Sequence, residues 1–258
     1  YFENFDDFLG VANERDIKVL PVMFTKVPWA VFKPQNFSAG KKYLEEWVPE
    51  FAEDERILAW DIVNGPDVIE SNLEKKGVED KYDLESFTRD IYEKIKEIDQ
   101  NHPVTIGTSD VHPFKEEELM EDLPRYIDHE DFGCIHFYVG PRHYDKVVNK
   151  VQNGIDKPLL LQEFGLPTTG DDKWHTEEAQ KRYYNKILEK SNREDLGGLM
   201  FWKVNDAPEN LSEVEVDIGP VYKNDHHKPF EHHFGILRDD YSKKPAAHVV
   251  EQYYKWIL

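Results

Sequence analysis

The stretch LLLQEFG, residues 159–165, has the form of a buried strand that ends in a carboxylate and a turn. Pro158–Gln162 lead into Glu163, and Phe164-Gly165 turns the chain directly after it. Polar residues at the carboxyl ends of buried parallel strands are where active sites of α/β barrels form. We therefore take Glu163 as the first candidate for chemistry. The alternative is a Glu at the end of a strand that is paired with a basic side chain.

A second stretch of the same form is WDIVNGPD, residues 60–67. The apolar run Ile57–Val63 predicts a strand, and Asn64-Gly65 follows at its end. Asn-Gly is a common turn dipeptide, so a plain turn is the alternative interpretation of this stretch.

Short apolar runs alternate with longer segments of helical period throughout the chain. This alternation predicts βα units around a parallel sheet, an α/β fold in a single domain covering residues 1–258. We expect strands at 17–24, 57–63, 104–108, 134–138, 159–164 and 199–204. We expect helices at 5–14, 41–51, 84–98 with Asp83 as cap, 143–153, from Thr176 onward, and 246–257.

The composition narrows the classes of partner. Of the 258 residues, 39% are hydrophobic, which is enough for a large core. The formal net charge of −20 argues against a nucleic-acid partner and against binding to anionic membranes. No apolar run is long enough to span a membrane, and no secretory signal is present, so the compartment stays open. Cys134 is the single cysteine and predicts a buried thiol without an internal disulfide.

The two stretches together resemble retaining glycoside hydrolases built on a TIM barrel, those of family 5 and its cellulase-like and β-mannanase-like relatives. In these enzymes the fourth strand ends in Asn-Glu-Pro and the seventh in Glu-Phe-Gly. The resemblance implies a (β/α)8 barrel in which the six expected strands correspond to the third to eighth. Strands one and two have no place before Ile17, and six strands cannot close such a barrel. We therefore expect an N-terminally incomplete domain, or a partner segment that completes it.

The resemblance also implies roles for residues at the strand ends. Glu163 would be the nucleophile and Asn64 the contact to the sugar 2-hydroxyl. Gly65 occupies the position of the general acid/base Glu, which is therefore vacant. His136 and Tyr138 would lie at the mouth, with the tyrosine hydroxyl holding the nucleophile. Alternation along a strand directs residues 136 and 138 to the same side.

Further residues of the expected mouth are substrate contacts. The resemblance implies that Trp202 forms the floor of the sugar site. Phe24, Trp29, Asp110 and Asp206 lie at or just beyond strand ends, as candidate rim residues.

The sequence thus predicts a retaining hydrolase of β-linked oligo- or polysaccharides, impaired at Gly65 and requiring no cofactor. One alternative is a carbohydrate-binding relative without catalysis on the same scaffold. Another is a metal-assisted hydrolase that uses the His-rich loop 226–233, whose histidines are His226, His227, His232 and His233. The ligand spacing of that loop is irregular, so we expect no metal there. The sugar and its linkage are set by loops whose geometry the sequence does not give.

Overall fold

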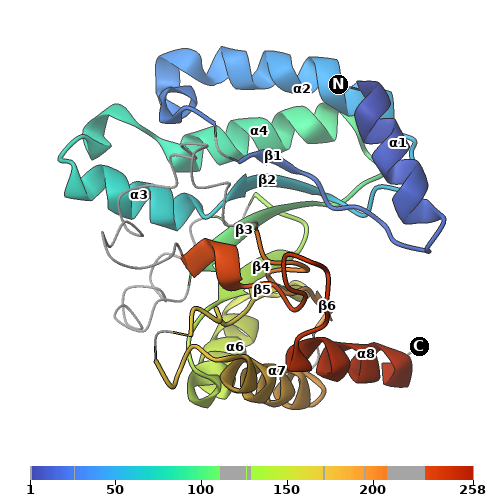
Figure 1. Cartoon of the computed structure of the whole chain (residues 1–258). Coiled ribbons are helices and arrows are strands. Elements are labelled where there is room, and N and C mark those ends of the chain that lie inside the picture. Colours follow the sequence, from blue (N-terminus) through green and yellow to red (C-terminus); the bar gives the residue numbers. More distant parts are fainter. Residues whose placement is uncertain are drawn as a thin grey trace. The chain divides into compact units, whose positions relative to one another are not determined.

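Helices and strands alternate along the chain, as Figure 1 shows. The computed structural model describes residues 2–25, 27–110, 126, 129–170, 172–194, 196–207 and 230–257. The strands are β1 (Val22–Phe24), β2 (Trp60–Asn64), β3 (Val104–Asp110), β4 (Gly133–Phe137), β5 (Leu159–Phe164) and β6 (Gly198–Leu199). Their order in the sheet follows the chain, β1-β2-β3-β4-β5-β6. The pairings β1–β2, β2–β3 and β5–β6 are parallel. The predicted α/β class with a parallel sheet is confirmed.

The chain divides into two compact units, and the division passes through β4 and β5. Unit 1 comprises residues 1–110, 117–135 and 152–159. Its helices are α1 (Phe2–Asn13), α2 (Phe37–Phe51), α3 (Pro66–Lys75) and α4 (Leu84–Ile98). Helices α2 and α4 lie side by side (Figure 1), and their apolar faces enter one core with the side chains of β2. Leu44, Val48, Phe87, Ile91 and Ile62 are completely buried in this core.

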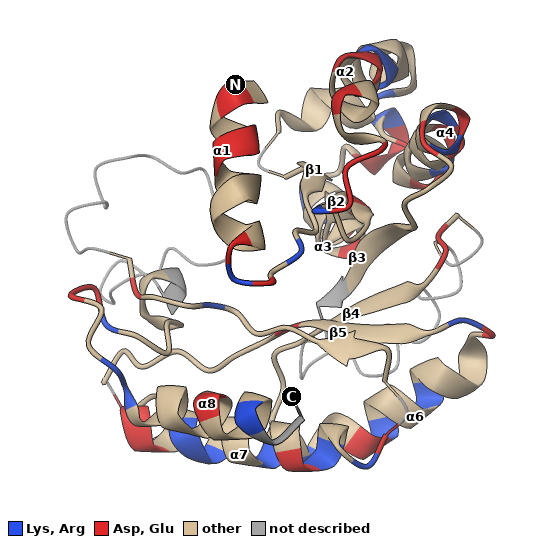
Figure 2. Ribbon diagram, turned by 90° about the vertical axis from the view of Figure 1, so that its right-hand side faces the viewer, with Lys and Arg blue, Asp and Glu red and all other residues tan. Residues whose placement is uncertain are grey.

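Unit 2 comprises residues 111–116, 136–151 and 160–258. Its helices are α6 (Tyr144–Gly154), α7 (Glu177–Ser191) and α8 (Pro245–Ile257), and α7 packs against α8. Figure 2 shows acidic and basic residues along α7 and α8, whereas β4 and β5 are mainly uncharged. This separation fits a sheet that is buried beneath helices whose outer faces carry charge.

Helix starts follow local side-chain chemistry. The Asp83 carboxylate accepts the Ser86 amide at 2.9 Å, which confirms the predicted cap of α4. Thr176 accepts the Ala179 amide at 3.2 Å and caps α7. Helix α3 was not expected, although Pro66 at its first position is a recognised start signal.

Two predicted strands are reduced in the structure to less than half of their expected length. The expected strand 17–24 reduces to β1, preceded by a single bridge between Val19 and Ile57. The expected strand 199–204 reduces to β6, which ends at Leu199. Beyond Leu199 the regular pairing ends, although the amides of Met200 and Trp202 still donate to carbonyls of β5 at 2.8 and 2.9 Å. Asn205 then pairs with Leu237 in an isolated parallel bridge. Trp202 therefore lies past the strand. Within the described ranges, no helix is long and apolar enough to cross a membrane.

The acidic side chain of Glu130 is buried in unit 1, with 3% of its surface exposed. Its Oε2 accepts the Ile106 amide at 3.2 Å. Burial raises the pKa of Glu130 well above its ordinary value of 4.5, and the nearby Asp61 carboxylate acts in the same direction. Lys157, whose ammonium donates to the Glu130 carbonyl at 2.7 Å, opposes the shift. The protonated carboxyl is therefore the form that favours folding.

A raised folded-state pKa gives a definite sign to the pH dependence of stability. The contribution of Glu130 is fully present below pH 4.5 and is lost as the pH rises through the folded-state pKa. We expect Glu130→Gln to raise the melting temperature at pH 8 by about 2–4 °C per kcal/mol gained, with the gain shrinking toward pH 4.5. Thermal denaturation at pH 4.5, 6 and 8 measures this. A gain that is equal at all three pH values would contradict it.

Candidate active site

Glu163 lies near the end of β5, and its side chain is partly accessible, with 19% of its surface exposed. The Tyr138 hydroxyl donates a hydrogen bond to Glu163 Oε2. Nδ1 of His136 lies 3.7 Å from the same oxygen. Both partners come from β4 or the residue just after it, and both belong to unit 2. The structure therefore brings together three of the predicted residues around one carboxylate oxygen.

His136 is oriented from its other ring nitrogen. Its Nε2 lies 3.0 Å from Gln162 Oε1, and both side chains are buried. With the amide oxygen of Gln162 as acceptor, the proton of the neutral imidazole resides on Nε2. Nδ1, which faces Glu163, then carries a proton only in the charged imidazolium. Gln162 thus sets the tautomer of His136. This role could not be predicted from the sequence, because a Gln near the end of a strand has no distinguishing pattern.

Gly165 allows the chain after β5 to pass close to its neighbours. A Cβ at this position would lie 2.2 Å from the Trp202 carbonyl oxygen and 2.9 Å from Cδ1 of Phe234. The Trp202 amide donates to the Phe164 carbonyl at 2.9 Å, so the two segments are in direct backbone contact. Trp202 is 37% exposed and lies beside the end of β5.

This close approach predicts a strong preference for glycine. We expect Gly165→Ala to destabilise the protein by about 1–3 kcal/mol, because the backbone at Trp202 has to move. Gly140→Ala is the matched control, since a Cβ there meets no atom within 4 Å. Urea denaturation of the two variants measures the difference. Equal urea midpoints for the two variants would show that the close backbone approach at Gly165 does not require glycine.

Asp206 was expected at the rim of the site, and the structure gives its carboxylate other partners. Asp206 is buried, its Oδ1 accepts the Gly235 amide at 2.8 Å, and Lys244 Nζ lies 2.7 Å from Oδ2. Both oxygens are therefore engaged by protein groups, and we leave Asp206 out of the proposed sugar contacts.

Asn64 and Gly65 lie at the end of β2 in unit 1. The Asn64 side chain is exposed, whereas Gly65 is buried. Gly65 has φ 61° and ψ 57°, the left-handed conformation that favours glycine. Its amide donates to the Gly107 carbonyl at 2.8 Å. A Cβ at Gly65 would meet only Val68, at an ordinary 3.6 Å, so the constraint is on the backbone and not on space.

The residues before Asn64 have structural partners within unit 1. Trp60 is completely buried, and its indole donates to Asp99 Oδ2 at 2.7 Å. The same oxygen lies 2.7 Å from Nδ1 of His102. Burial raises the pKa of Asp99, but the hydrogen bonds from Trp60 and His102 outweigh it, so the pKa lies below its usual value. Asp61 is buried and accepts the Gly107 amide at 3.1 Å. Trp60 and Asp61 thus fix β2, and Asn64 is the exposed residue of the stretch.

The remaining rim candidates differ in their surroundings. Phe24 is 4% exposed and packs edge-on against Tyr43 and Phe87, so its ring belongs to the core and is left out of the proposed site. Trp29 is half-buried, with the Lys76 ammonium 4.4 Å from its ring centroid. The side chain of Asp110 lies outside the described residues.

Several solved structures that superpose on this chain are carbohydrate-active enzymes. A GH2 β-galacturonidase from Eisenbergiella tayi, bound to galacturonate, superposes with a TM-score of 0.67 at 18% identity, covering 96% of this chain and 42% of the other. A GH5_18 protein from Streptomyces cattleya, in complex with Manβ1-4GlcNAc, gives 0.68 at 15% identity, covering 90% and 57%. A hyperthermostable endo-1,4-β-D-mannanase from Thermotoga petrophila gives 0.67 at 18% identity, covering 99% and 80%.

These comparisons establish the fold and nothing finer. At identities below one fifth, they show that the chain shares the TIM-barrel fold of these enzymes, which confirms the predicted fold class. The chain spans about half the length of the first two structures. No protein-family model matches the chain, and no curated protein sequence matches it either.

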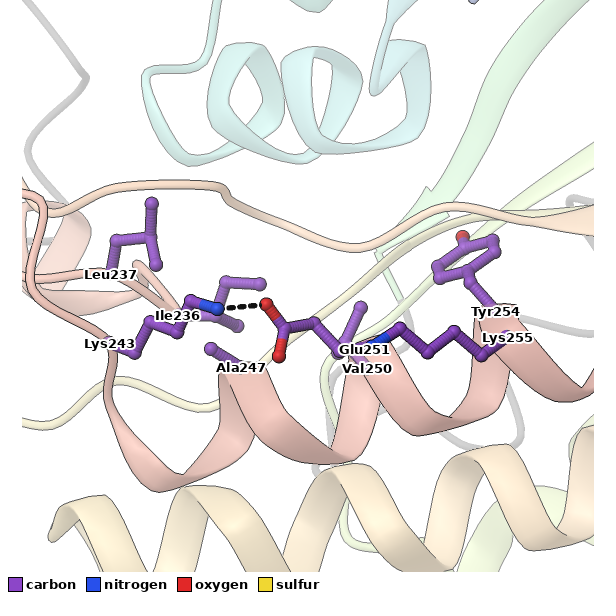
Figure 3. A pocket seen from close by; sticks show the side chains of 8 residues that line it. All are labelled: Ile236, Leu237, Lys243, Ala247, Val250, Glu251, Tyr254 and Lys255. Carbon is purple, nitrogen blue, oxygen red and sulfur yellow. Dashed lines mark hydrogen bonds and ion pairs between the residues drawn. The ribbon is translucent and has the colours of Figure 1, made fainter.

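A pocket of about 470 Å³ lies against α8 in unit 2. Figure 3 labels the side chains that line it. Apolar side chains contribute much of its lining, and the Lys243–Glu251 ion pair is also part of it. None of the predicted site residues lines this pocket. A cavity without the candidate carboxylate has no part in the proposed chemistry.

The described residues do not include the whole of the His-rich loop 226–233, which was the alternative metal site. His226 and His227 lie outside the described residues. Among the residues that are described, no group of three or more His, Cys, Asp or Glu side chains could hold a metal ion.

Lys244 is the residue of this region that sequence reasoning missed. It is 1% exposed and is bound to Asp206. Its burial could not be predicted, because basic residues are mostly expected on the surface. Only its long-range contacts identify it.

Proposed function

We propose that this protein is a glycoside hydrolase of the retaining type, resembling family 5, that acts on β-linked oligo- or polysaccharides. The observation that carries the proposal is the Glu163 carboxylate, partly exposed at the end of β5 and held at Oε2 by Tyr138. A nucleophile needs such a position, accessible to a substrate yet fixed in orientation. The fold shared with carbohydrate-active enzymes supports the same reaction class.

In the proposed mechanism, Glu163 attacks the anomeric carbon of the sugar. A C–O bond forms to the carboxylate as the glycosidic C–O bond breaks, and the electron pair leaves with the aglycone oxygen. Tyr138 orients the carboxylate before attack. His136, with its tautomer fixed by Gln162, lies beside the same oxygen. Asn64 is the proposed contact to the 2-hydroxyl and Trp202 the proposed stacking surface.

Because of Gly65, the chain lacks a general acid/base at this position in the proposed reaction. In the enzymes it resembles, the residue at this position protonates the leaving oxygen and then activates water. Glycine has no side chain to do either. We therefore propose that the chain forms a glycosyl-enzyme only from substrates whose leaving group needs no proton, and that it releases the sugar slowly.

The test uses a panel of 2,4-dinitrophenyl β-glycosides. Their leaving group departs as a stable anion, so the first step does not need a general acid. We expect a burst of dinitrophenolate equal to the enzyme concentration, and intact-protein mass spectrometry should show one added glycosyl group. Azide, an anion that needs no general base, should then release the sugar as a glycosyl azide. The absence of both burst and mass shift with every sugar would refute the proposal.

One observation favours a carbohydrate-binding protein without catalysis as the second candidate. The left-handed backbone at Gly65 suits glycine, as expected if glycine is the long-established residue at this position. Calorimetric titration with β-linked oligosaccharides distinguishes the two candidates. Binding heat without any dinitrophenolate burst would support the second.

A further inference from the structure

Lys244 directly precedes α8 in the chain. Its ammonium group lies in the interior of unit 2. It is 1% exposed, and its Nζ donates to Thr168 Oγ1 at 2.7 Å and to Asp206 Oδ1 at 2.9 Å. Burial lowers the pKa of Lys244, and the ion pair with Asp206 opposes that effect. A buried charge of this kind is tolerated only with paired and directed partners. The pair therefore fixes the segments that carry Thr168, Asp206 and Lys244 to one another.

The same pair holds the backbone on both sides of Phe234. Asp206 Oδ1 accepts the Gly235 amide at 2.8 Å. The His233 carbonyl accepts the Thr168 amide at 3.0 Å and Thr168 Oγ1 at 3.1 Å. Lys244 Nζ lies 3.4 Å from that carbonyl oxygen. Phe234 thus lies between two residues that the ion pair and its neighbour Thr168 anchor.

Phe234 connects this anchor to the candidate nucleophile. Its ring packs edge-on against Tyr138, with centroids 5.7 Å apart and an interplanar angle of 79°. Phe234 is 8% exposed, so its ring has little room to reorient. Tyr138 in turn donates to Glu163. A contiguous path therefore runs from the buried ion pair through Phe234 and Tyr138 to the carboxylate.

We propose that Lys244 and Asp206 are positioning residues for Glu163: their buried ion pair holds Phe234 against the Tyr138 ring and so fixes the hydroxyl that orients the nucleophile. The positional part of this inference concerns the protein alone. Its catalytic part depends on the proposed function. The pair would act without touching the sugar.

The test reads the environment of Tyr138 directly. The protein is labelled with 3-fluorotyrosine, and its fluorine NMR signal for Tyr138 is assigned by its loss in Tyr138→Phe. We expect Lys244→Met to shift or broaden that signal. Thr168→Val, a milder change that keeps the ion pair, should shift it in the same direction and by less. This second variant keeps the test valid if Lys244→Met fails to fold.

Ser191→Ala is the matched control in unit 2. It removes the hydrogen bond between Ser191 and the Tyr144 hydroxyl, which are 2.7 Å apart. It should therefore move the Tyr144 signal and leave that of Tyr138 in place. If Lys244 only stabilised the fold, as many other residues do, Ser191→Ala and Lys244→Met would have the same effect on the Tyr138 signal.

A kinetic readout accompanies the NMR. With the dinitrophenyl glycoside that labels the protein, Lys244→Met should lower the saturating rate of glycosylation by about 10- to 100-fold, with little change in the half-saturating concentration. An unchanged Tyr138 signal in both Lys244→Met and Thr168→Val would overturn the inference. If the unsubstituted chain shows no burst, the proposed function fails, while a shifted Tyr138 signal would still support the positional coupling.

Discussion

Gly65→Glu should raise the rate of hydrolysis of unactivated β-linked oligosaccharides by about 10²–10⁴-fold, the range typical of a general acid/base. The reason is that the substitution supplies a group able to protonate the leaving oxygen and activate water. The first atom of the new side chain fits, because a Cβ at this position meets only Val68, at 3.6 Å. Reducing-sugar release from β-mannan, β-glucan and xylan oligomers measures the gain and identifies the sugar at the same time.

The backbone conformation at Gly65 is expected to lower the stability of any variant with a side chain there. A control variant has to separate this loss of stability from the catalytic effect of the new carboxyl group. With φ at 61°, any side chain there is expected to destabilise the protein by about 1–2 kcal/mol. Gly65→Gln carries the same strain and nearly the same shape without the carboxyl group. A gain in Gly65→Glu that Gly65→Gln lacks is therefore due to the acid. Equal, low activity in two folded variants would contradict the assignment of Gly65 as the vacant position.

Glu163→Gln should abolish the activity gained by Gly65→Glu, with a loss of about 10⁴-fold or more, because the covalent route has no nucleophile. In the unsubstituted chain it should also remove the burst with dinitrophenyl glycosides. The amide keeps the size of the side chain and can still accept from the Tyr138 hydroxyl, so large losses of stability are not expected. Burst kinetics and thermal denaturation of the same preparation separate the two effects.

Tyr138→Phe is the companion change for this comparison. It removes only the hydroxyl that donates to Glu163. We expect a smaller loss of glycosylation rate than in Glu163→Gln, since the nucleophile remains but is less well held. A burst that survives Glu163→Gln at full size would assign the chemistry to another residue.

The features that the sequence predicted well are those decided by neighbouring residues. The cap at Asp83 and the start of α7 at Thr176 follow from side chains that bond amides three residues away. The end of the last strand could not be predicted the same way. The apolar run past Leu199 has the pattern of a strand, but regular pairing ends there: only single backbone bonds from Met200 and Trp202 to β5 follow.

In the candidate site, too, features set by neighbouring residues were predictable and features set by distant residues were not. Alternation along β4 predicted that residues 136 and 138 share a side, and both side chains meet Glu163. The surroundings of Asp206 depend instead on Lys244, 38 positions away, which no local pattern reveals. Phe24 was misplaced for a related reason: an aromatic residue at a strand end can point to the core or to the mouth, and its partners Tyr43 and Phe87 lie far along the chain.

Peptide mapping of the trapped intermediate tests the assignment of the nucleophile most directly. The protein is labelled with the most reactive dinitrophenyl glycoside, digested with pepsin at low pH, and sequenced by tandem mass spectrometry. We expect the glycosyl group on Glu163, within the peptide that spans residues 159–165. A sugar attached to any other carboxylate, or none attached despite tight oligosaccharide binding, would contradict the role given to Glu163.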